Sequence, residues 1–327
     1  MKKPLYILVI LGFLAAPSSG QQLPLYSQYM MNGFLLNPAI AGSDGYTTFS
    51  LTAREQWLGF NQAPKTHALS LQSRLLKRSY IIKGRSVYNK RFKPARTGRV
   101  GIGGYIYNDR NGLVNRNGVQ FSYAYHIRLR QSQLSFGLSG SVFQFNLLDD
   151  QIWFHDQEIE PLVYDGSTRR VLFVPDANFG VYLLNYNYYA GLSVAQLFQS
   201  YLKIGNNTFD NYRLLRHFYF TTGYTFDLGN GFALEPSLLL KTTETWRTQL
   251  DINTKILYQQ DLWLGASFRT GTSLILMGGF RVNQLYFGYA FDYTLSSIMK
   301  YSLGSHEVMI ALKLGDNARR YRWLERY

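Results

Sequence analysis

The chain has 327 residues, a formal net charge of +14 and no cysteine, and 16% of its residues are aromatic while only 17% are charged. The aromatic content excludes a disordered chain, which would lack the residues that build a core. The absence of cysteine excludes disulfide scaffolds, thiol catalysis and zinc–thiolate sites. A positive charge of this size is compatible with nucleic-acid binding, but the export signal at the start of the chain argues against a nucleic-acid partner.

Residues 1–20 are expected to form a secretory signal peptide that is removed on export. Lys2 and Lys3 supply its positive start, Leu5 to Ala16 its apolar stretch, and Ser18 to Gly20 the small residues that suit cleavage. The alternative is a short membrane anchor, but about 12 apolar residues cannot cross a ~30 Å hydrocarbon core as a helix. No later part of the chain approaches the run of about 18 apolar residues that a membrane helix needs.

Residues 21–46 are expected to form an N-terminal segment that lies in a lumen or in the periplasm, ahead of the first strand. Within it, Leu36 to Ser43 reads Leu-Asn-Pro-Ala-Ile-Ala-Gly-Ser. Asn37 and Pro38 predict a turn or an extended break, because proline removes a donor and restricts the residue before it. Ala41 to Ser43 permits close approach of the backbone. A structural turn is the simpler interpretation, and a lumen plug or a partner contact is the functional alternative.

From residue 47 onward, large apolar residues alternate with small or polar ones, which is the period of a β-strand. Between Val119 and Leu129, and again between Leu285 and Tyr293, every second side chain is large and apolar or aromatic. A soluble sandwich also alternates, but the expected strands are about 9–13 residues long, as a tilted bilayer crossing requires. Tyrosine and phenylalanine gather near the strand ends, as interfacial girdles do. We therefore expect an all-β transmembrane antiparallel β-barrel over residues 47–315.

About fourteen strands are expected, an even number as single-chain barrels need. Asn111-Gly112, Gly229 to Gly231 and Thr270 to Thr272 hold residues that tolerate positive φ, so they predict tight turns. Longer connections are expected near 76–96, 147–175, 198–213 and 295–305. The expected strands are 47–58, 65–75, 97–110, 113–129, 133–146, 176–186, 188–197, 214–228, 232–245, 248–258, 261–269, 273–282, 285–294 and 306–314.

Two segments combine positive charge with interleaved aromatic residues. One runs from Lys77 to Arg99 without an acidic residue, and the other is the expected C-terminal tail, 316–327. Both fall on the periplasmic side of a barrel of about fourteen strands whose N-terminus is periplasmic. They are candidates for a surface that binds an acidic periplasmic partner, whereas the alternatives are a solvated loop or a loop paired with anionic lipid headgroups. The candidate partner-binding residues are Lys77, Arg78, Lys83, Arg85, Lys90, Arg91, Lys93, Arg96, Arg320 and Arg322.

Several motifs occur together along the chain. They are Leu36 to Ser43, Arg54 to Phe60, Ala63 to Thr66, Gly101 to Gly112 and Gly304 to Met309. Together they resemble the PorP/SprF family of outer-membrane proteins, from about residue 22 to residue 314. The residues that the family motifs single out as structural are Asn37, Pro38, Ala39, Gly42, Arg54, Gln56, Trp57, Pro64, Ser305, His306 and Glu307.

This resemblance implies a non-enzymatic barrel in the outer membrane of gliding Gram-negative bacteria, tied to the type IX secretion system and gliding motility. One family branch is an accessory to surface export of a gliding adhesin. The other is a core component linked to a periplasmic peptidoglycan-binding lipoprotein. Outer-membrane lipid, one of these two partners and other secretion components are therefore the expected contacts. A diffusion channel or small-solute transporter is the main alternative function, and an outer-membrane enzyme is the third.

Arg54 and Gln56 are expected to share the polar face of the first strand, and inside a barrel Arg54 would need a carboxylate partner. Asp251, Asp292 and Glu307 also fall on inward positions, so we expect a lumenal charge network, with a solute pathway as the alternative. No local motif supports a Ser/His catalytic group, and the His-Glu-x-x-His spacing of a metal site is absent. Asn108 to Gly112 has too few carboxylates for a calcium loop and predicts a hairpin turn. We expect no catalytic residue, no metal and no cofactor.

Overall fold

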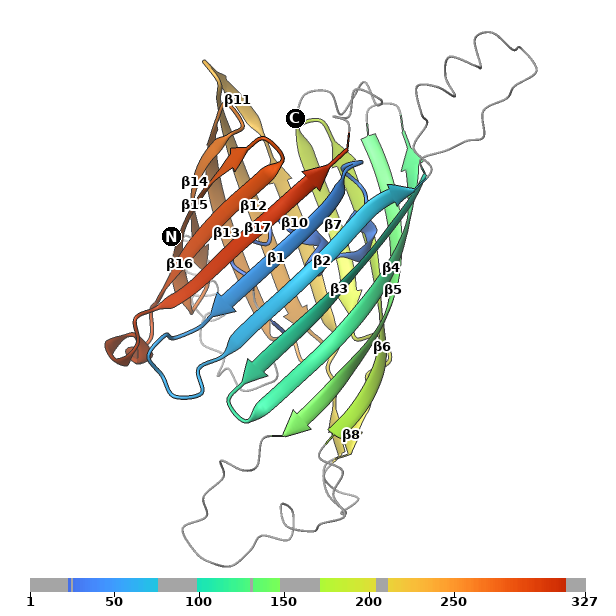
Figure 1. Cartoon of the computed structure of the whole chain (residues 1–327), viewed down its shortest axis with the longest axis vertical. Coiled ribbons are helices and arrows are strands. Elements are labelled where there is room, and N and C mark those ends of the chain that lie inside the picture. The colour runs from blue at the N-terminus through green and yellow to red at the C-terminus, as the bar shows by residue number, and fades with distance from the viewer. Residues whose placement is uncertain are drawn as a thin grey trace, which may run out of the picture.

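The alternating sequence folds into a closed antiparallel β-barrel of 14 strands (Figure 1). The computed structural model describes residues 23–24, 26–75, 99–129, 132–147, 171–203 and 211–315. Each strand pairs with its neighbours along the chain, and the ring closes where the first strand pairs with the last. The wall strands are β1 (Thr47–Glu55), β2 (Lys65–Leu75), β3 (Val100–Asn111), β4 (Val114–Arg128), β5 (Ser132–Leu147), β6 (Val171–Asn185), β7 (Tyr188–Ala195), β10 (His217–Tyr224) continued by β11 (Phe226–Gly229), β12 (Phe232–Thr243), β13 (Thr248–Tyr258), β14 (Leu262–Arg269), β15 (Ser273–Val282), β16 (Leu285–Thr294) and β17 (Ser305–Leu314).

Each expected strand corresponds to one wall strand, but some boundaries differ. β6 begins at Val171 rather than at 176, because its first residues pair in register with β5. The expected strand 214–228 is interrupted at Thr225, so that β10 and β11 pair one after the other with β12. The connection expected at 198–213 contains a small separate hairpin, β8 (Tyr201–Lys203) with β9 (Asn211–Arg213). The wall strands range in length from 8 residues in β7 to 16 residues in β5.

The two faces of the barrel wall differ in the way that the alternation predicts. On β4, Phe121 and Tyr123 are 67% and 51% exposed on the outside, while Gln120 and Ser122 are 4% and 0% exposed on the inside. The outer face is therefore the apolar one, as a bilayer requires. The inner face is polar and filled. In the described part of the chain, no helix has the length and apolar character needed to span a bilayer.

The two ends of the barrel are distinguished by their connections. One end holds the β1–β2, β3–β4, β5–β6, β7–β10, β12–β13, β14–β15 and β16–β17 connections, and we call it the Gly112 end after its β3–β4 turn. The β16–β17 connection there includes the short 3₁₀ helix η4 (Ser297–Tyr301). The opposite Asn230 end holds the β11–β12 turn. The predicted tight turns are present, since Gly112, Asn230 and Gly271 have φ values of 59°, 54° and 71°.

Residues 26–46 lie inside the ring, and we call them the lumenal segment (Figure 1). The segment includes two short 3₁₀ helices, η1 (Gly33–Leu35) and η2 (Pro38–Ile40). η2 contacts β4, β5 and β6, whereas Ser27 and Gln28 bond to β17 on a distant part of the wall. Phe34 and Ala39 are 0% exposed. Only a segment inside the lumen can reach strands so far apart around the ring.

Candidate functional site

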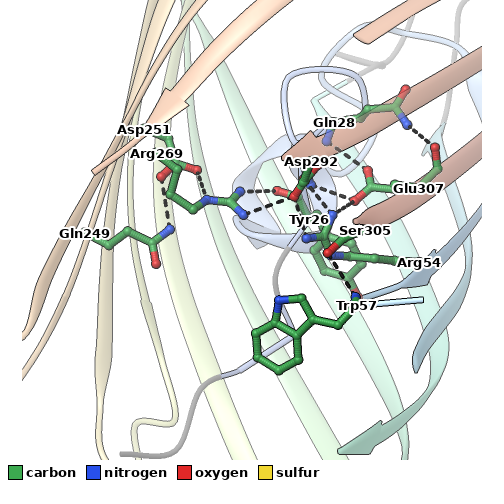
Figure 2. A network of polar contacts seen from close by, with 11 residues as sticks. Tyr26, Gln28, Arg54, Trp57, Gln249, Asp251, Arg269, Asp292, Ser305 and Glu307 are labelled. Carbon is green, nitrogen blue, oxygen red and sulfur yellow. Dashed lines mark hydrogen bonds and ion pairs between the residues drawn. The ribbon is translucent and has the colours of Figure 1, made fainter. Parts of the chain in front are cut away.

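An ion-pair network lies on the inner wall where β1, β16 and β17 meet (Figure 2). Arg54 on β1 places Nη2 2.6 Å from Asp292 Oδ2 on β16, and Nη1 3.2 Å from Glu307 Oε2 on β17. The strand register brings these groups together, because Arg54 pairs directly with Glu307. All three side chains are almost completely buried. Arg54 therefore has the carboxylate partners that its inward position requires.

Arg269 on β14 extends the network to a further carboxylate. Its Nε lies 2.9 Å from Asp251 Oδ2 on β13, and its Nη1 lies 3.6 Å from Asp292 Oδ2. Gln249 also donates to Asp251 Oδ1 at 3.0 Å. Alternation along the chain predicts the inward position of Asp251, but it does not single out Arg269. The available signal was the pairing of the two neighbouring strands, which sets Arg269 directly opposite Asp251.

The network contains two guanidinium groups and three carboxylates. The lumenal segment supplies additional hydrogen-bond donors to it. The backbone N–H groups of Ser27 and Gln28 donate to the two oxygens of Glu307 at 2.7 and 2.8 Å. The Ser27 hydroxyl donates to Asp292 at 2.8 Å and accepts from Arg54 Nη1 at 2.6 Å. Buried charges are tolerated only when they are paired and hydrogen-bonded. The segment and the network therefore stabilise each other.

Two tyrosine side chains of the lumenal segment, Tyr26 and Tyr29, are buried inside the barrel. Tyr29 is 3% exposed, packs against Tyr219 and Leu239, and accepts a hydrogen bond from Asn253 Nδ2 on β13. Burial is the main cause that raises the pKa of the Tyr29 phenol, and it also raises the pKa of Tyr26. Both phenols therefore stay neutral inside the barrel.

The Asn37 motif fixes the other end of the segment to the wall. Asn37 Nδ2 donates to the carbonyls of Val181 on β6 and Leu192 on β7, at 3.1 and 3.2 Å. Its Oδ1 accepts from the Ala39 N–H at 2.9 Å and so caps η2. Gly42 has a φ of 65°, and a Cβ there would lie 2.7 Å from a carbonyl oxygen on β2. Glycine is therefore required at position 42 for two reasons: the positive φ, and the lack of room for a Cβ.

Glycines on the wall make room for the segment. A Cβ at Gly137 on β5 would lie 2.2 Å from the Ala39 nitrogen, and one at Gly101 on β3 would lie 1.9 Å from the Ala41 oxygen. The same Ala41 carbonyl accepts from His126 Nε2 on β4 at 3.0 Å. These contacts place Ala39 and Ala41 of the segment directly against β3, β4 and β5.

The remaining motif residues join connections at the Gly112 end. β1 ends before Gln56, so Gln56 does not share the polar face of the first strand as expected, because its N–H donates instead to the Pro64 carbonyl at 2.8 Å. The Trp57 N–H donates to the Ser305 hydroxyl at 3.2 Å, beside the network (Figure 2). His306 lies on β17, and its Nδ1 lies 2.7 Å from a tyrosine hydroxyl on β16.

The expected hairpin turn at Asn108 to Gly112 is shorter than the sequence indicated. β3 continues to Asn111, and the turn itself is at Gly112. Asp109 points inward, accepts from the Thr66 hydroxyl at 2.7 Å and pairs with Arg116 at 2.9 Å. Across the described ranges, no group of three or more acidic or histidine side chains is arranged to hold a metal ion.

A cavity of about 80 Å³ remains between the lumenal segment and the wall. Leu23, Pro24 and Tyr26 line it on one side, and residues of β3 to β7 and β10 line it on the other. Its wall is partly aromatic, through Tyr107 and Tyr219 among others. The cavity is far smaller than an open channel through the barrel would be.

The candidate partner-binding residues from Lys77 to Arg96, together with Arg320 and Arg322, lie outside the described residues. Their role as a docking surface therefore stays a prediction. The same holds for the expected signal peptide over residues 1–20.

Comparison with known proteins gives one match that covers nearly the whole chain. The profile of a family described as type IX secretion system membrane protein PorP/SprF matches residues 18–312. No curated protein matches the chain.

Solved structures with a similar fold are outer-membrane barrels. The outer membrane protein Omp33 of Acinetobacter baumannii is 9% identical, with a TM-score of 0.43 over 83% of this chain and 100% of that one. BamA of Haemophilus ducreyi is 6% identical, with a TM-score of 0.40 over 82% and 70%. Outer membrane phospholipase A of Escherichia coli is 11% identical, with a TM-score of 0.33 over 83% and 90%. At these sequence identities and TM-scores, the similarity to the three structures supports no conclusion about function.

Proposed function

Because the chain belongs to the PorP/SprF family of type IX secretion system membrane proteins, we propose that it is a non-enzymatic outer-membrane barrel that binds other proteins and is not itself the conduit for cargo. The family membership supports a place in the secretion machinery. The filled lumen supports a binding role over a transport role. Processing after Gly20 belongs to the same proposal, and sequencing of the mature N-terminus tests it, with Gln21 as the expected first residue.

The single observation that carries this proposal is the way the lumenal segment is held. Its Ser27 and Gln28 bond to Glu307 on β17, and its Asn37 bonds to β6 and β7. A cargo chain passing through the lumen would have to break both sets of contacts. Breaking buried charge-assisted hydrogen bonds leaves unpaired charges, which is costly.

The proposed partner is a periplasmic peptidoglycan-binding lipoprotein, or else a secreted adhesin whose surface export the barrel supports. The proposed contact surface is the positively charged stretch from Lys77 to Arg96, with Arg320 and Arg322. Opposite charge on a partner would speed and orient the encounter more than it would add to affinity. An acidic partner surface is therefore part of the proposal.

Affinity purification of a tagged barrel from cross-linked cells tests this directly. Lys90, Arg91 and Lys93 are changed together to glutamate, and Lys300→Glu, an exposed position at the Gly112 end, serves as the control. The triple variant is expected to lose its partner while the control retains it. Recovery of a lipoprotein identifies one family branch, and recovery of an adhesin identifies the other. Equal recovery by both variants at physiological salt contradicts the proposed surface.

The enzyme alternative has little geometric support. His126 Nδ1 lies 2.7 Å from the Ser135 hydroxyl, which resembles half of a catalytic group. However, Ser135 is 0% exposed, and His126 Nε2 is already bonded to Ala41. A nucleophile needs access to substrate and an orienting third group. The pair instead holds the lumenal segment in place.

A further inference from the structure

The buried carboxylates of the barrel differ in whether a cation lies beside them. Five acidic residues among those that the structure describes are less than a tenth exposed. Four of them form an ion pair with an arginine. They are Asp109 with Arg116, Asp251 with Arg269, and Asp292 and Glu307, both with Arg54. The fifth, Asp176 on β6, has no ion-pair partner in the part of the chain that the structure describes.

Asp176 faces inward, is 4% exposed and has one carboxylate oxygen without a donor. Its Oδ1 accepts the N–H groups of Ala177 and Phe198, at 2.7 and 3.1 Å. Within the described ranges, its Oδ2 is buried and accepts no hydrogen bond. A buried carboxylate that lacks both a cation and a donor on one oxygen is a costly arrangement. This position therefore calls for a ligand that carries a positive charge and N–H donors.

The polar groups around Asp176 lie in one row across four strands. The register pairs Asp176 with Ser141 on β5, Ser141 with Gln120 on β4, and Gln120 with Tyr105 on β3. All four residues line the cavity of about 80 Å³. Gln120 Oε1 is already engaged, because the Tyr105 hydroxyl and the Asn178 amide donate to it at 3.0 and 2.6 Å. The Asp176 carboxylate is therefore the charged acceptor that this row offers to a ligand.

The cavity combines this carboxylate with a wall that suits a cation. At about 10–15 Å³ for each water position, its volume fits a group of a few heavy atoms. Aromatic rings attract cations, and the aromatic residues that line the cavity are Tyr26, Tyr105, Tyr107, Phe143 and Tyr219. Arg116 also lines it, but its charge is balanced by Asp109 at 2.9 Å. The register sets Arg116 opposite Phe145, nearer the Gly112 end than Ser141, which lies opposite Asp176.

We propose that this cavity is a binding site for a primary ammonium group. The ammonium donates to Asp176 Oδ2 and neutralises its charge, and the aromatic wall contacts the alkyl part of the ligand. A hard metal ion suits the cavity less well, since such ions take six or more oxygen ligands and much of this wall is apolar or aromatic. The site does not depend on which protein partner the barrel has.

The test measures binding of methylammonium to the purified full-length mature barrel in detergent, by calorimetry at constant ionic strength. Methanol is the neutral probe of similar size. Saturable binding of methylammonium, and none of methanol, is expected. Asp176→Asn should weaken it by at least about tenfold, because the charge is lost while the shape is kept, and charge-assisted hydrogen bonds are the strong ones. Glu235→Gln is the matched control and should bind as the wild type does, since Glu235 is an inward carboxylate that pairs with Lys255 at 3.1 Å and does not line the cavity.

Folding of the variants is checked by their unfolding midpoints. Asp176→Asn should be at least as stable as the wild type, because it removes an unpaired charge and keeps an acceptor for the two backbone N–H groups. The amide of Nα-acetyl-lysine is a second probe, whose ammonium end alone needs to enter the cavity. Tighter binding of this probe points to a lysine side chain of another protein, and tighter binding of methylammonium points to a free amine. Absence of saturable methylammonium binding, equal binding of methanol, or undiminished binding by Asp176→Asn overturns the site.

Discussion

The guanidinium of Arg54 connects three parts of the molecule: the strand β1, the carboxylates of β16 and β17, and Ser27 of the lumenal segment. A buried ion pair of this kind adds little net stability compared with apolar residues of the same volume. Its effect appears when one partner is removed, because the remaining charges are then left unpaired in a dry environment. Arg54 therefore specifies where the lumenal segment sits.

Substitution of Arg54 tests this role. Arg54→Met should lower the free energy of unfolding by about 3–5 kcal/mol, since it leaves Asp292 and Glu307 without their cation. Lys65→Met is the control, because Lys65 forms an ion pair with Glu55 that is largely exposed, and such pairs contribute about 0–1 kcal/mol. The measurement is equilibrium unfolding in denaturant, followed by tryptophan fluorescence. Equal effects of the two substitutions contradict the account.

Single outward residues report the position of the bilayer. Phe121 on β4 is 67% exposed on the outer face. Phe121→Arg should cost about 2–4 kcal/mol of folding free energy in lipid vesicles if the position lies near the midplane. Phe121→Leu keeps an apolar surface and should change little. If arginine is tolerated there as well as leucine, Phe121 does not face hydrocarbon.

Residues of the network differ in how far the sequence could predict them. Arg54, Asp251, Asp292 and Glu307 were placed on the inner face by alternation alone, and a carboxylate partner for Arg54 was expected. Which carboxylates would meet it could not be predicted, because that depends on the register of strands far apart in sequence. The hydrogen bond from the Ser27 backbone to Glu307 could not be predicted either, since a backbone N–H donor gives no signal in the sequence.

At the level of elements, the lumenal segment and the wall match each other in shape. The wall carries glycines where the segment comes closest, at Gly101, Gly137 and Gly180. The sequence alone indicates only that these glycines lie in strands. The structure shows that they leave room for residues 37–41, which pack against them. A segment without periodicity gives no sequence signal for the surface it packs on, so the sequence favours a structural turn and leaves a lumen plug or a partner contact as the alternative.

Two glycines of the same strand separate packing from strand propensity. A Cβ at Gly137 would collide with Ala39, whereas one at Gly140 would meet nothing within 4 Å. Gly137→Val should expel the lumenal segment and expose it to chymotrypsin, with cleavage near Phe34. Gly140→Val should leave the segment protected. Protection of the segment in both variants would show that it does not pack on β5 as described.

At the level of the whole molecule, the two ends of the barrel should face different compartments. We expect the Gly112 end to face the cell exterior, because long barrel loops are usually external. The chain has no cysteine, so single cysteines can be introduced at chosen positions. Trp246→Cys, at an 85% exposed position in the β12–β13 connection, should react with a membrane-impermeant maleimide in intact cells. Asn230→Cys should react only after permeabilisation, and the reverse pattern would invert the orientation.

Residues 26–46 occupy the lumen, and on this ground we propose that the barrel binds other proteins and does not conduct cargo. Conductance in planar lipid bilayers tests it most directly, with the wild-type barrel compared with a variant that lacks residues 26–46. The account predicts no large steady conductance for the wild type and a clear increase for the variant. A large steady conductance of the wild-type barrel would contradict the account and favour a diffusion channel.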